Sequence, residues 1–227
     1  MTTTFVTGAH ESLGYRLIEA GHTVIVGARD PQRGRAAAGA LGARFVQIDV
    51  TDDASVTAAV TDVEAHEGNI DVLINNAGVP GTHSTADQVT AADATAVFDV
   101  NVVGIVRVTH AFPPLLRKSE NPVIVNVSSA MGSFAAAHDA ECAESRAIAP
   151  LHTASKAAVT MLTAQYAKSW PDMKVNAAGP GYTATDFNAH SGPQTVTEGT
   201  DAIVELATVG VDGPTGTFRD RYGAVAW

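Results

Sequence analysis

The sequence has few of the features that define several other classes of protein. It contains one cysteine, Cys142, so no intramolecular disulfide can form, and Met1–Gly14 lacks the pattern of a signal peptide. No uncharged apolar run approaches the roughly 18 residues of a membrane span. We therefore expect a protein of the reducing cytoplasm with no membrane partner.

Positive charge is also scarce. The 227 residues include 14 Lys and Arg against 24 Asp and Glu, which gives a net charge of −10. Such a surface repels phosphate backbones and argues against general nucleic-acid binding, although a local site can still accept one small phosphorylated ligand. The hydrophobic fraction of 45% and the charged fraction of 17% suit a globular chain with a sizeable core.

Short β-branched runs alternate with alanine-rich stretches. The runs are apolar throughout, as strands buried on both faces of a parallel sheet are. Strands are expected at Thr3–Thr7, His22–Val26, Arg44–Ile48, Ile70–Ile74, Val123–Val127 and Lys174–Ala177. Helices are expected at Pro31–Leu41, Asp53–His66, Ala91–Lys118, Ala149–Trp170 and Thr195–Thr208. This alternation predicts a doubly wound, Rossmann-type α/β fold that binds ligands at the carboxyl ends of its strands.

No linker, repeat or charge block divides the chain. We therefore expect residues 1–227 to form a single domain with a mostly parallel, seven-stranded sheet, in which Thr215–Phe218 leads into the last strand. The first junction between a strand and a helix reads Thr7-Gly8-Ala9-His10-Glu11-Ser12-Leu13-Gly14. Backbone N–H groups and a helix dipole at such a junction suit a pyrophosphate. Gly8 is expected to make the turn, and Gly14 to let the helix pack closely on the strand.

This loop resembles the Thr-Gly-x-x-x-Gly-x-Gly fingerprint of the short-chain dehydrogenase/reductase family, and the resemblance covers essentially the whole chain. The other matching motifs are Asp49, Asn75-Asn76-Ala77-Gly78, Asn101, Ser129, Lys156 and Pro180-Gly181, in the family's order. The resemblance is to carbonyl-reductase-like members. It implies an oxidoreductase in which hydride moves between a nicotinamide and an apolar carbonyl or alcohol substrate.

The resemblance also implies which residues contact the cofactor. They are Gly8, Ser12, Leu13, Gly14, Asp49, Asn76, Ala77, Gly78, Lys156, Pro180, Gly181, Thr183 and Thr185. Ala28 stands where NAD-binding members carry a carboxylate, and Arg29 follows it. The guanidinium groups of Arg29 and Arg33 suit a 2′-phosphate, so NADP(H) is favoured over NAD(H). The alternative is that both are solvated loop charges.

The catalytic set of the family contains an Asn, a Ser and a Tyr-x-x-x-Lys pair on one helix face. Asn101, Ser129 and Lys156 match this set, but His152 stands at the Tyr position. The family's Tyr transfers a proton to or from the substrate oxygen, which its Ser holds, while the Lys lowers the phenol pKa and binds the ribose. Imidazole is an acid or base near neutral pH, so we expect His152 to replace the Tyr as proton donor.

Three departures put cofactor binding in doubt. Ser12 replaces the family's middle glycine, and the Glu11 carboxylate would repel a 2′-phosphate. Only Tyr15 to Ala20 separate Gly14 from Gly21, so the first helix is expected to lack about one turn, roughly four residues. Two other functions therefore stay open. One is a non-redox cyclase, isomerase, dehydratase or lyase that uses His152, and the other is a non-catalytic nucleotide-sensing or scaffolding protein.

Two further chemistries have weaker support. A hydrolase built on Ser129, His152 and Asp186 lacks the Gly-x-Ser-x-Gly motif. His138 and Cys142 would share a helix face in the long connection Gly132–Pro150, but no second ligand pair follows, so no metal is expected.

The expected partners are a small-molecule substrate and further copies of the chain. Tyr182 is a candidate for the wall of the substrate pocket. Family members commonly pair through the helices that correspond to Ala91–Lys118 and Ala149–Trp170, so the resemblance implies a homodimer or homotetramer.

Overall fold

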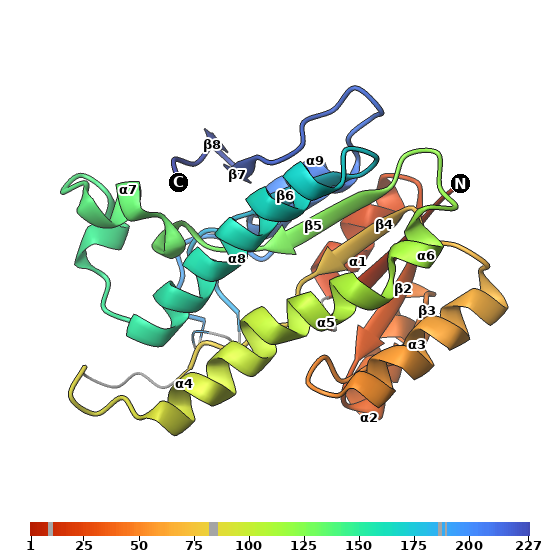
Figure 1. The fold of residues 1–227 in the computed structure, drawn as a ribbon, viewed down its shortest axis with the longest axis horizontal. Coiled ribbons are helices and arrows are strands. Elements are labelled where there is room, and N and C mark those ends of the chain that lie inside the picture. The colour runs from red at the N-terminus through yellow and green to blue at the C-terminus, as the bar shows by residue number, and fades with distance from the viewer. Residues whose placement is uncertain (9–10, 82–85, 186–187, 189) are drawn as a thin grey trace.

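The computed structural model describes residues 1–8, 11–81, 86–185, 188 and 190–227. Its strands are β1 (Thr2–Thr7), β2 (His22–Ala28), β3 (Arg44–Gln47), β4 (Val72–Asn75), β5 (Val123–Val127), β6 (Lys174–Ala178), β7 (Phe218–Asp220) and β8 (Gly223–Ala224). They form one sheet in the order β3-β2-β1-β4-β5-β6-β7-β8 (Figure 1). Every neighbouring pair is parallel except β7 and β8. The predicted Rossmann-type fold is confirmed, and the strand beyond the predicted seven is a two-residue return against β7.

Helices follow the strands as predicted. The α-helices are α1 (Glu11–Glu19), α2 (Pro31–Leu41), α3 (Asp53–His66), α4 (Ala91–Phe98), α5 (Gly104–Ala111), α6 (Pro113–Leu116), α7 (Phe134–His138), α8 (Pro150–Ser169) and α9 (Asp201–Ala207). Shorter helical turns are η1 (Asp99–Val103), η2 (Ala130–Gly132), η3 (Ala143–Arg146) and η5 (Glu198–Thr200). In the described part of the chain, no helix combines the length and apolar composition needed to cross a membrane.

The sheet lies between two layers of helices. Side chains of α1, α2 and α9 form a core with Val6 and Val125 on one face. Side chains of α3, α5 and α6 form a second core with Phe5 and Ile124 on the other. Figure 1 shows α3, α5 and α8 in front of the strands. β4 and β5 are buried at every residue, and apart from Asn75 and Asn126 their side chains are apolar without alternation.

The predicted continuous helix Ala91–Lys118 is wrong in detail, because it is divided into α4, η1, α5 and α6. Proline has no N–H to donate to the preceding turn, so a new helix begins at Pro113. The wider, π-type turn η1 separates α4 from α5 and carries Asn101, which is fully buried. Turns of this kind inside helices often occur at functional sites.

The order of the strands places the expected ligand site. β1, β2 and β3 follow one another toward one edge of the sheet, and the chain then returns to put β4 on the other side of β1. In open parallel sheets, ligands bind at the carboxyl ends of the strands where the order reverses in this way. Gly8 follows β1 and residues 76–78 follow β4, so the topology brings two predicted cofactor segments together.

Candidate active site

Polar contacts tie the carboxyl ends of β1 and β4 together. Asn76 Nδ2 donates to the carbonyl oxygens of Thr7 at 3.0 Å and Gly8 at 3.4 Å. The backbone N–H groups of Asn76 and Ala77 donate to Thr7 Oγ1 at 3.0 and 3.1 Å. Gly8 has a φ of 82°, and a Cβ on it would lie 3.1 Å from Asn76 Nδ2. Backbone conformation and limited space therefore both favour glycine at this turn.

Ser12, Leu13 and Gly14 lie in the first turns of α1. Leu13 is 0% exposed and belongs to the core, so it offers a ligand only its backbone. A Cβ on Gly14 would lie 2.3 Å from Cδ1 of Leu41 in α2. Gly14 thus lets α1 and α2 approach each other, while its predicted role in packing of the helix on the strand stays a prediction. α1 has nine residues, and its shortness relative to other members of the family stays a prediction.

Glu11 is the first residue of α1 and is exposed. Its carboxylate lies at the positive end of the helix dipole, where an acidic side chain stabilises the helix. The same charge opposes a phosphate at this helix end. Glu11 therefore favours the local fold and disfavours the predicted ligand.

Arg29, Arg33 and Asp49 lie near the carboxyl ends of β2 and β3. Arg29 and Arg33 are exposed, and Asp30 between them caps α2 by accepting two backbone N–H bonds at 2.8 and 3.0 Å. Asp49 follows β3. Burial raises the pKa of Asp49, but hydrogen bonds from Thr51 and the charge of Arg29 outweigh burial, so the pKa is lowered overall. The two guanidinium groups are therefore available to bind a phosphate, and the Asp49 carboxylate is available to accept a hydrogen bond from a nucleotide base.

A buried amide links the end of β4 to α8. Val79 N–H donates to Asn101 Oδ1 at 2.8 Å, and Asn101 Nδ2 donates to the Val79 carbonyl at 2.9 Å. Asn101 Nδ2 also donates to Ser155 Oγ at 3.0 Å, and that hydroxyl donates to the His152 carbonyl at 2.8 Å. Asn101 therefore holds η1, the segment after β4 and the first turn of α8 in one arrangement.

Lys156 lies one helical turn after His152 and reaches the carboxyl end of β5. Its Nζ donates to the Val127 carbonyl at 2.7 Å, and the residue is 6% exposed. Burial lowers the pKa of Lys156 from 10.5 to about 8, because desolvation penalises the ammonium form. A Cβ on Gly78 would lie 3.3 Å from Asn101 Oδ1 and 3.8 Å from Lys156 Nζ. Glycine at position 78 thus leaves space beside both polar groups.

Ser129 lies directly before η2, and His152 lies in the first turn of the neighbouring helix α8. Ser129 precedes η2, and its Oγ accepts from the Met131 N–H at 3.3 Å. His152 is half-buried in the first turn of α8, with its Nδ1 atom buried. Ser128 Oγ donates to the Lys156 carbonyl at 3.1 Å, so the end of β5 packs directly on α8. The third member of the hydrolase alternative, Asp186, lies outside the described residues.

The segment after β6 packs against η5. Gly181 has a φ of 70°, and a Cβ on it would lie 2.2 Å from Gln194 Oε1. Thr183 is 8% exposed, donates through Oγ1 to the Pro180 carbonyl at 2.9 Å and pairs with Gln194 in an isolated bridge. A Cβ on Gly199 in η5 would lie 2.3 Å from Thr183 Oγ1. The position of this segment therefore depends on η5.

Two other predicted residues lie in the same connection. The N–H of Thr185 donates to Asn188 Oδ1 at 3.3 Å. Tyr182, the candidate pocket residue, is 57% exposed, and its hydroxyl lies 2.6 Å from Ser191 Oγ.

The long connection before α8 does not form the helix-face pair considered for zinc. α7 ends at His138, and Cys142 lies beyond it, directly before η3. In the ranges that the structure describes, no group of three or more His, Cys, Asp and Glu side chains is arranged to hold a metal ion. The connection packs instead on the end of the chain, where Ser133 Oγ donates to the Ala226 carbonyl at 2.6 Å.

Sequence reasoning missed three residues that shape the site. Ser155 relays the Asn101 contact to α8, and Gly132 allows η2 to approach that helix. Asn126 Oδ1 accepts from Asn75 Nδ2 at 2.8 Å across β4 and β5. An amide inside the apolar run Val123–Val127 was a usable signal, since a buried polar group needs a partner. The residues next to Ser155 and Gly132 in the sequence gave no signal for the contacts that these two residues make.

Gly132 gives a first prediction. A Cβ on it would lie 2.6 Å from both the Ala157 nitrogen and the Lys156 carbonyl carbon. Gly132→Ala should therefore lower the free energy of unfolding by about 1–3 kcal/mol, the usual cost of overpacking. Gly39→Ala is the control, because nothing lies within 4 Å of that position in α2, and it should stabilise by about 0.5–1 kcal/mol. Urea unfolding checks both, and equal effects would contradict the close approach.

The comparisons with known proteins agree with this geometry. The family model described as short chain dehydrogenase matches residues 2–195. The chain belongs to the short-chain dehydrogenase/reductase family, a family of oxidoreductases.

The similar proteins include dehydrogenases and reductases. The chain is 34% identical to "Short-chain dehydrogenase anuI" of Penicillium roqueforti, covering 90% of this chain and 88% of the relative. It is 30% identical to (-)-isopiperitenone reductase of Mentha piperita, covering 97% and 96%. Among solved structures, an NADPH-bound carbonyl reductase from chicken fatty liver superposes with a TM-score of 0.86 at 26% identity, covering 100% and 99%. Nicotinamide binding and reductase chemistry are thus found among its relatives.

Proposed function

We propose that this chain is an NADP(H)-dependent oxidoreductase that transfers hydride between the nicotinamide and an apolar carbonyl or alcohol substrate. One observation carries the proposal, namely the buried ammonium of Lys156 at the carboxyl end of β5, beside Asn101 and Gly78. No described carboxylate pairs with this ammonium. Because an unpaired buried charge is costly, it is found where function requires it. The family and the NADPH-bound carbonyl reductase support the reaction class and the cofactor.

Several residues at the carboxyl edge of the sheet suit a dinucleotide, whereas the exposed carboxylate of Glu11 opposes a phosphate at the start of α1. Side chains at Gly8 and Gly78 would fill space beside Asn76 and Lys156, and glycine keeps that space open. When bound, the nicotinamide supplies or accepts the hydride. The remaining residues proposed to hold it are Ser12, Leu13 and Gly14 through α1, Arg29, Arg33 and Asp49 at the adenosine end, Ala77 near the ribose, and Pro180, Gly181, Thr183 and Thr185 at the nicotinamide end.

We assign the protonation step to His152, which we place at the position of the family's Tyr. In reduction, its imidazolium would give a proton to the substrate oxygen as that oxygen gains negative charge. Ser129 would hold the oxygen by a hydrogen bond, and Lys156 would bind the ribose. Asn101 would keep the first turn of α8 in place through Ser155.

Binding of the cofactor tests this proposal directly. We expect the purified protein to quench or shift NADPH fluorescence with saturation, and to oxidise NADPH in the presence of an apolar ketone or aldehyde. Absence of saturable NADPH binding would contradict it. Turnover without cofactor that His152→Ala abolishes would favour the cyclase, isomerase, dehydratase or lyase alternative. The comparisons with known proteins do not favour that alternative or a scaffolding role.

The choice of NADP(H) over NAD(H) gives a second prediction. Arg29→Ala should raise the Kd of NADPH about 10- to 100-fold, because hydrogen bonds to a charged partner contribute about 1.5–3 kcal/mol, and should leave the Kd of NADH unchanged. Arg35→Ala is the matched control, since the Arg35 guanidinium lies over the Phe45 ring, 5.7 Å from its centroid. Equal effects of Arg29→Ala on both cofactors would contradict a 2′-phosphate contact.

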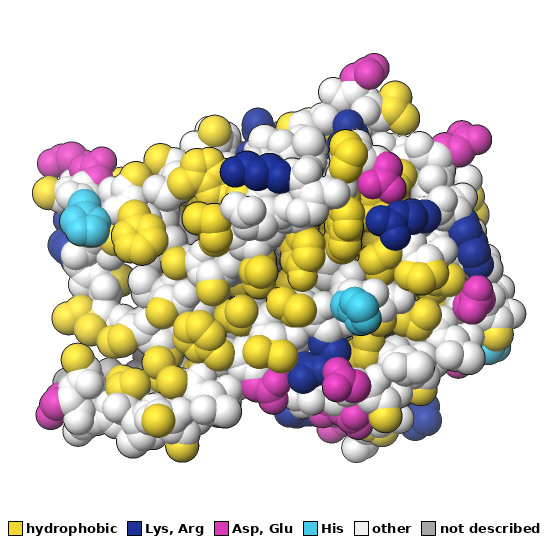
Figure 2. All heavy atoms as spheres, viewed as in Figure 1, with side chains coloured by type: hydrophobic (Ala, Val, Ile, Leu, Met, Phe, Trp, Pro, Cys, Tyr) yellow, Lys and Arg dark blue, Asp and Glu magenta, His cyan; other side chains and the backbone are white. Residues whose placement is uncertain are grey.

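We also propose that the chain forms a homodimer or homotetramer. Figure 2 shows apolar side chains over the face where α5 and α8 lie, and the exposed fractions of Val103, Val106 and Met161 are 43%, 39% and 61%. Contiguous exposed apolar surface is typical of protein interfaces. Light scattering after size exclusion tests the assembly, and a monomer at micromolar concentration would contradict it.

A further inference from the structure

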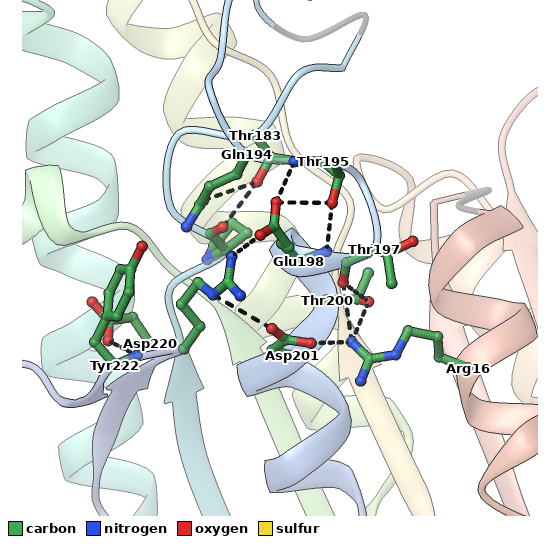
Figure 3. A network of polar contacts seen from close by, with 12 residues as sticks. Arg16, Thr183, Gln194, Thr195, Thr197, Glu198, Thr200, Asp201, Asp220 and Tyr222 are labelled. Carbon is green, nitrogen blue, oxygen red and sulfur yellow. Dashed lines mark hydrogen bonds and ion pairs between the residues drawn. The ribbon is translucent and has the colours of Figure 1, made fainter.

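Arg16 joins α1 to the segment before α9 (Figure 3). Its Nη1 contacts Asp201 Oδ1 at 2.5 Å and donates to Thr200 Oγ1 and to the Thr197 carbonyl, each at 3.0 Å. These partners belong to η5, its flank and the first residue of α9. One guanidinium therefore holds three consecutive parts of this turn against α1.

Arg221 holds the same turn from the opposite side. It lies between β7 and β8, and its Nη1 contacts Glu198 Oε1 at 2.6 Å while its Nε lies 3.5 Å from Asp201 Oδ2. Asp201 thus contacts both arginines, and Figure 3 shows its side chain between Arg16 and the rest of the network around Glu198. We call Arg16, Glu198, Asp201 and Arg221 the η5 clamp.

Glu198 has a second set of contacts that reaches back toward the candidate active site. Its Oε2 accepts from the N–H and Oγ1 of Thr195 at 2.8 and 2.9 Å, and Thr195 Oγ1 accepts from the Glu198 N–H at 3.2 Å. The Arg221 contact and these hydrogen bonds lower the pKa of Glu198 to about 2. The carboxylate is therefore ionised at neutral pH and binds Arg221 and Thr195 together.

The clamp is connected to the predicted nicotinamide segment by direct packing. Thr183 lies against Gly199 in the middle of η5 and pairs with Gln194, the neighbour of Thr195. A shift of η5 would therefore move Thr183.

A single exposed ion pair holds a segment weakly, but the four side chains of the clamp are only 26–39% exposed and share their partners.

We propose that the η5 clamp is a set of positioning residues that fixes residues 180–185 over the carboxyl edge of the sheet and so determines the affinity for the cofactor. The effect of the clamp on cofactor affinity rests on the proposed function. The effect of the clamp on the position of residues 180–185 does not. The clamp acts through Thr183 and the backbone and takes no part in proton or hydride transfer.

Hydrogen exchange in the cofactor-free protein tests the structural half. Arg221→Gln and Glu198→Gln should each raise amide exchange in residues 181–185 and 194–200 about fivefold or more, within the range of coupling between neighbouring charged pairs. The glutamine at 198 keeps an oxygen for the Thr195 N–H, so a change in that variant reports the lost charge. The double variant should exchange no faster than Arg221→Gln alone.

Glu205→Gln is the matched control. It removes the negative charge from the 3.1 Å contact between Glu205 and Arg219 of β7, which joins α9 to the same hairpin one turn beyond the clamp. Exchange in residues 181–185 and 194–200 should stay at the wild-type rate in this control. Arg221→Lys should recover part of the wild-type protection in the same residues. Equal exchange in Arg221→Gln and Glu205→Gln would overturn the clamp, whether or not the protein binds NADPH.

NADPH titration and steady-state kinetics test the functional half. Arg221→Gln should raise the Kd and KM of NADPH about fivefold, in line with the same coupling, and should change kcat less than twofold. Faster exchange with an unchanged Kd would overturn the proposed effect on the cofactor. If the wild type does not bind NADPH, the proposed function fails, and the exchange data still decide whether the clamp fixes the segment.

Discussion

Lys156→Met should unfold at a higher temperature than the wild type and lose at least about a hundredfold in kcat/KM for NADPH-dependent carbonyl reduction, the lower range for a group that takes part in proton transfer. The loss follows because the ammonium is proposed to bind the ribose and to supply positive charge near the transferred proton. Methionine has a similar length but neither charge nor donor.

The expected gain in stability follows from the buried charge. The pKa of Lys156 falls from 10.5 to about 8 on folding, which at 1.36 kcal/mol per unit is a penalty of about 3 kcal/mol on the protonated folded state. Loss of the charged hydrogen bond to the buried Val127 carbonyl costs the variant about 1.5–3 kcal/mol. We therefore expect a net gain of about 1 kcal/mol at pH 7, measured by urea unfolding.

The pH dependence checks the cause of that gain. Because the folded pKa lies below the unfolded pKa, the unfolded chain binds the proton more tightly between about pH 8 and pH 10.5, and wild-type stability should rise with pH across this window. The advantage of Lys156→Met should shrink over the same window. A variant less stable than the wild type at pH 7 would contradict the costly burial, and unchanged activity would contradict the role of Lys156.

His152→Ala should lower kcat about a hundredfold or more, the usual contribution of a general acid or base, with the Kd of NADPH unchanged. His152→Tyr should restore reduction to at least the wild-type rate, because a phenol at this position reaches further and lies one turn from Lys156. The half-buried first turn of α8 is held through Ser155, so both substitutions should keep the helix in place.

His66→Ala is the control for this pair, since the His66 side chain is 58% exposed on α3 and contacts Asp62 of its own helix. It should leave kcat unchanged. Equal rates in His152→Ala and the wild type would contradict the assignment of the proton donor. A tyrosine variant that binds NADPH but stays inactive would show that the redox arrangement has been lost elsewhere.

Much of the fold was predictable because its signals are local. The bounds of α2 and α3 were predicted to the residue, since Asp30 and Asp52 cap them through contacts within a few positions. The apolar runs predicted strands buried on both faces, and their order predicted the Rossmann-type topology. Proline at 113 also carried a local signal for the end of α5, but the helical periodicity continued through it and concealed the break.

The candidate site was predictable as a set of positions but not as a set of contacts. The loop after β1, residues 75–78 and Lys156 stood out in the sequence, and the topology brings their strand ends together. The partner of Gly14 did not stand out, because Leu41 approaches it from another helix. The η5 clamp likewise joins residues 16, 198, 201 and 221, and no spacing rule connects positions so far apart.

The sequence by itself thus determined the sheet, the order of its elements and the chemical groups available at its carboxyl edge, because periodicity, caps and turn residues act over a few positions. Only the tertiary structure decided how those groups behave. Burial between β5, Gly78 and Asn101 lowers the pKa of Lys156, and the approach of η2 to α8 requires glycine at 132. Desolvation and close packing depend on atoms brought together from distant segments, and their effects exist only in the folded chain.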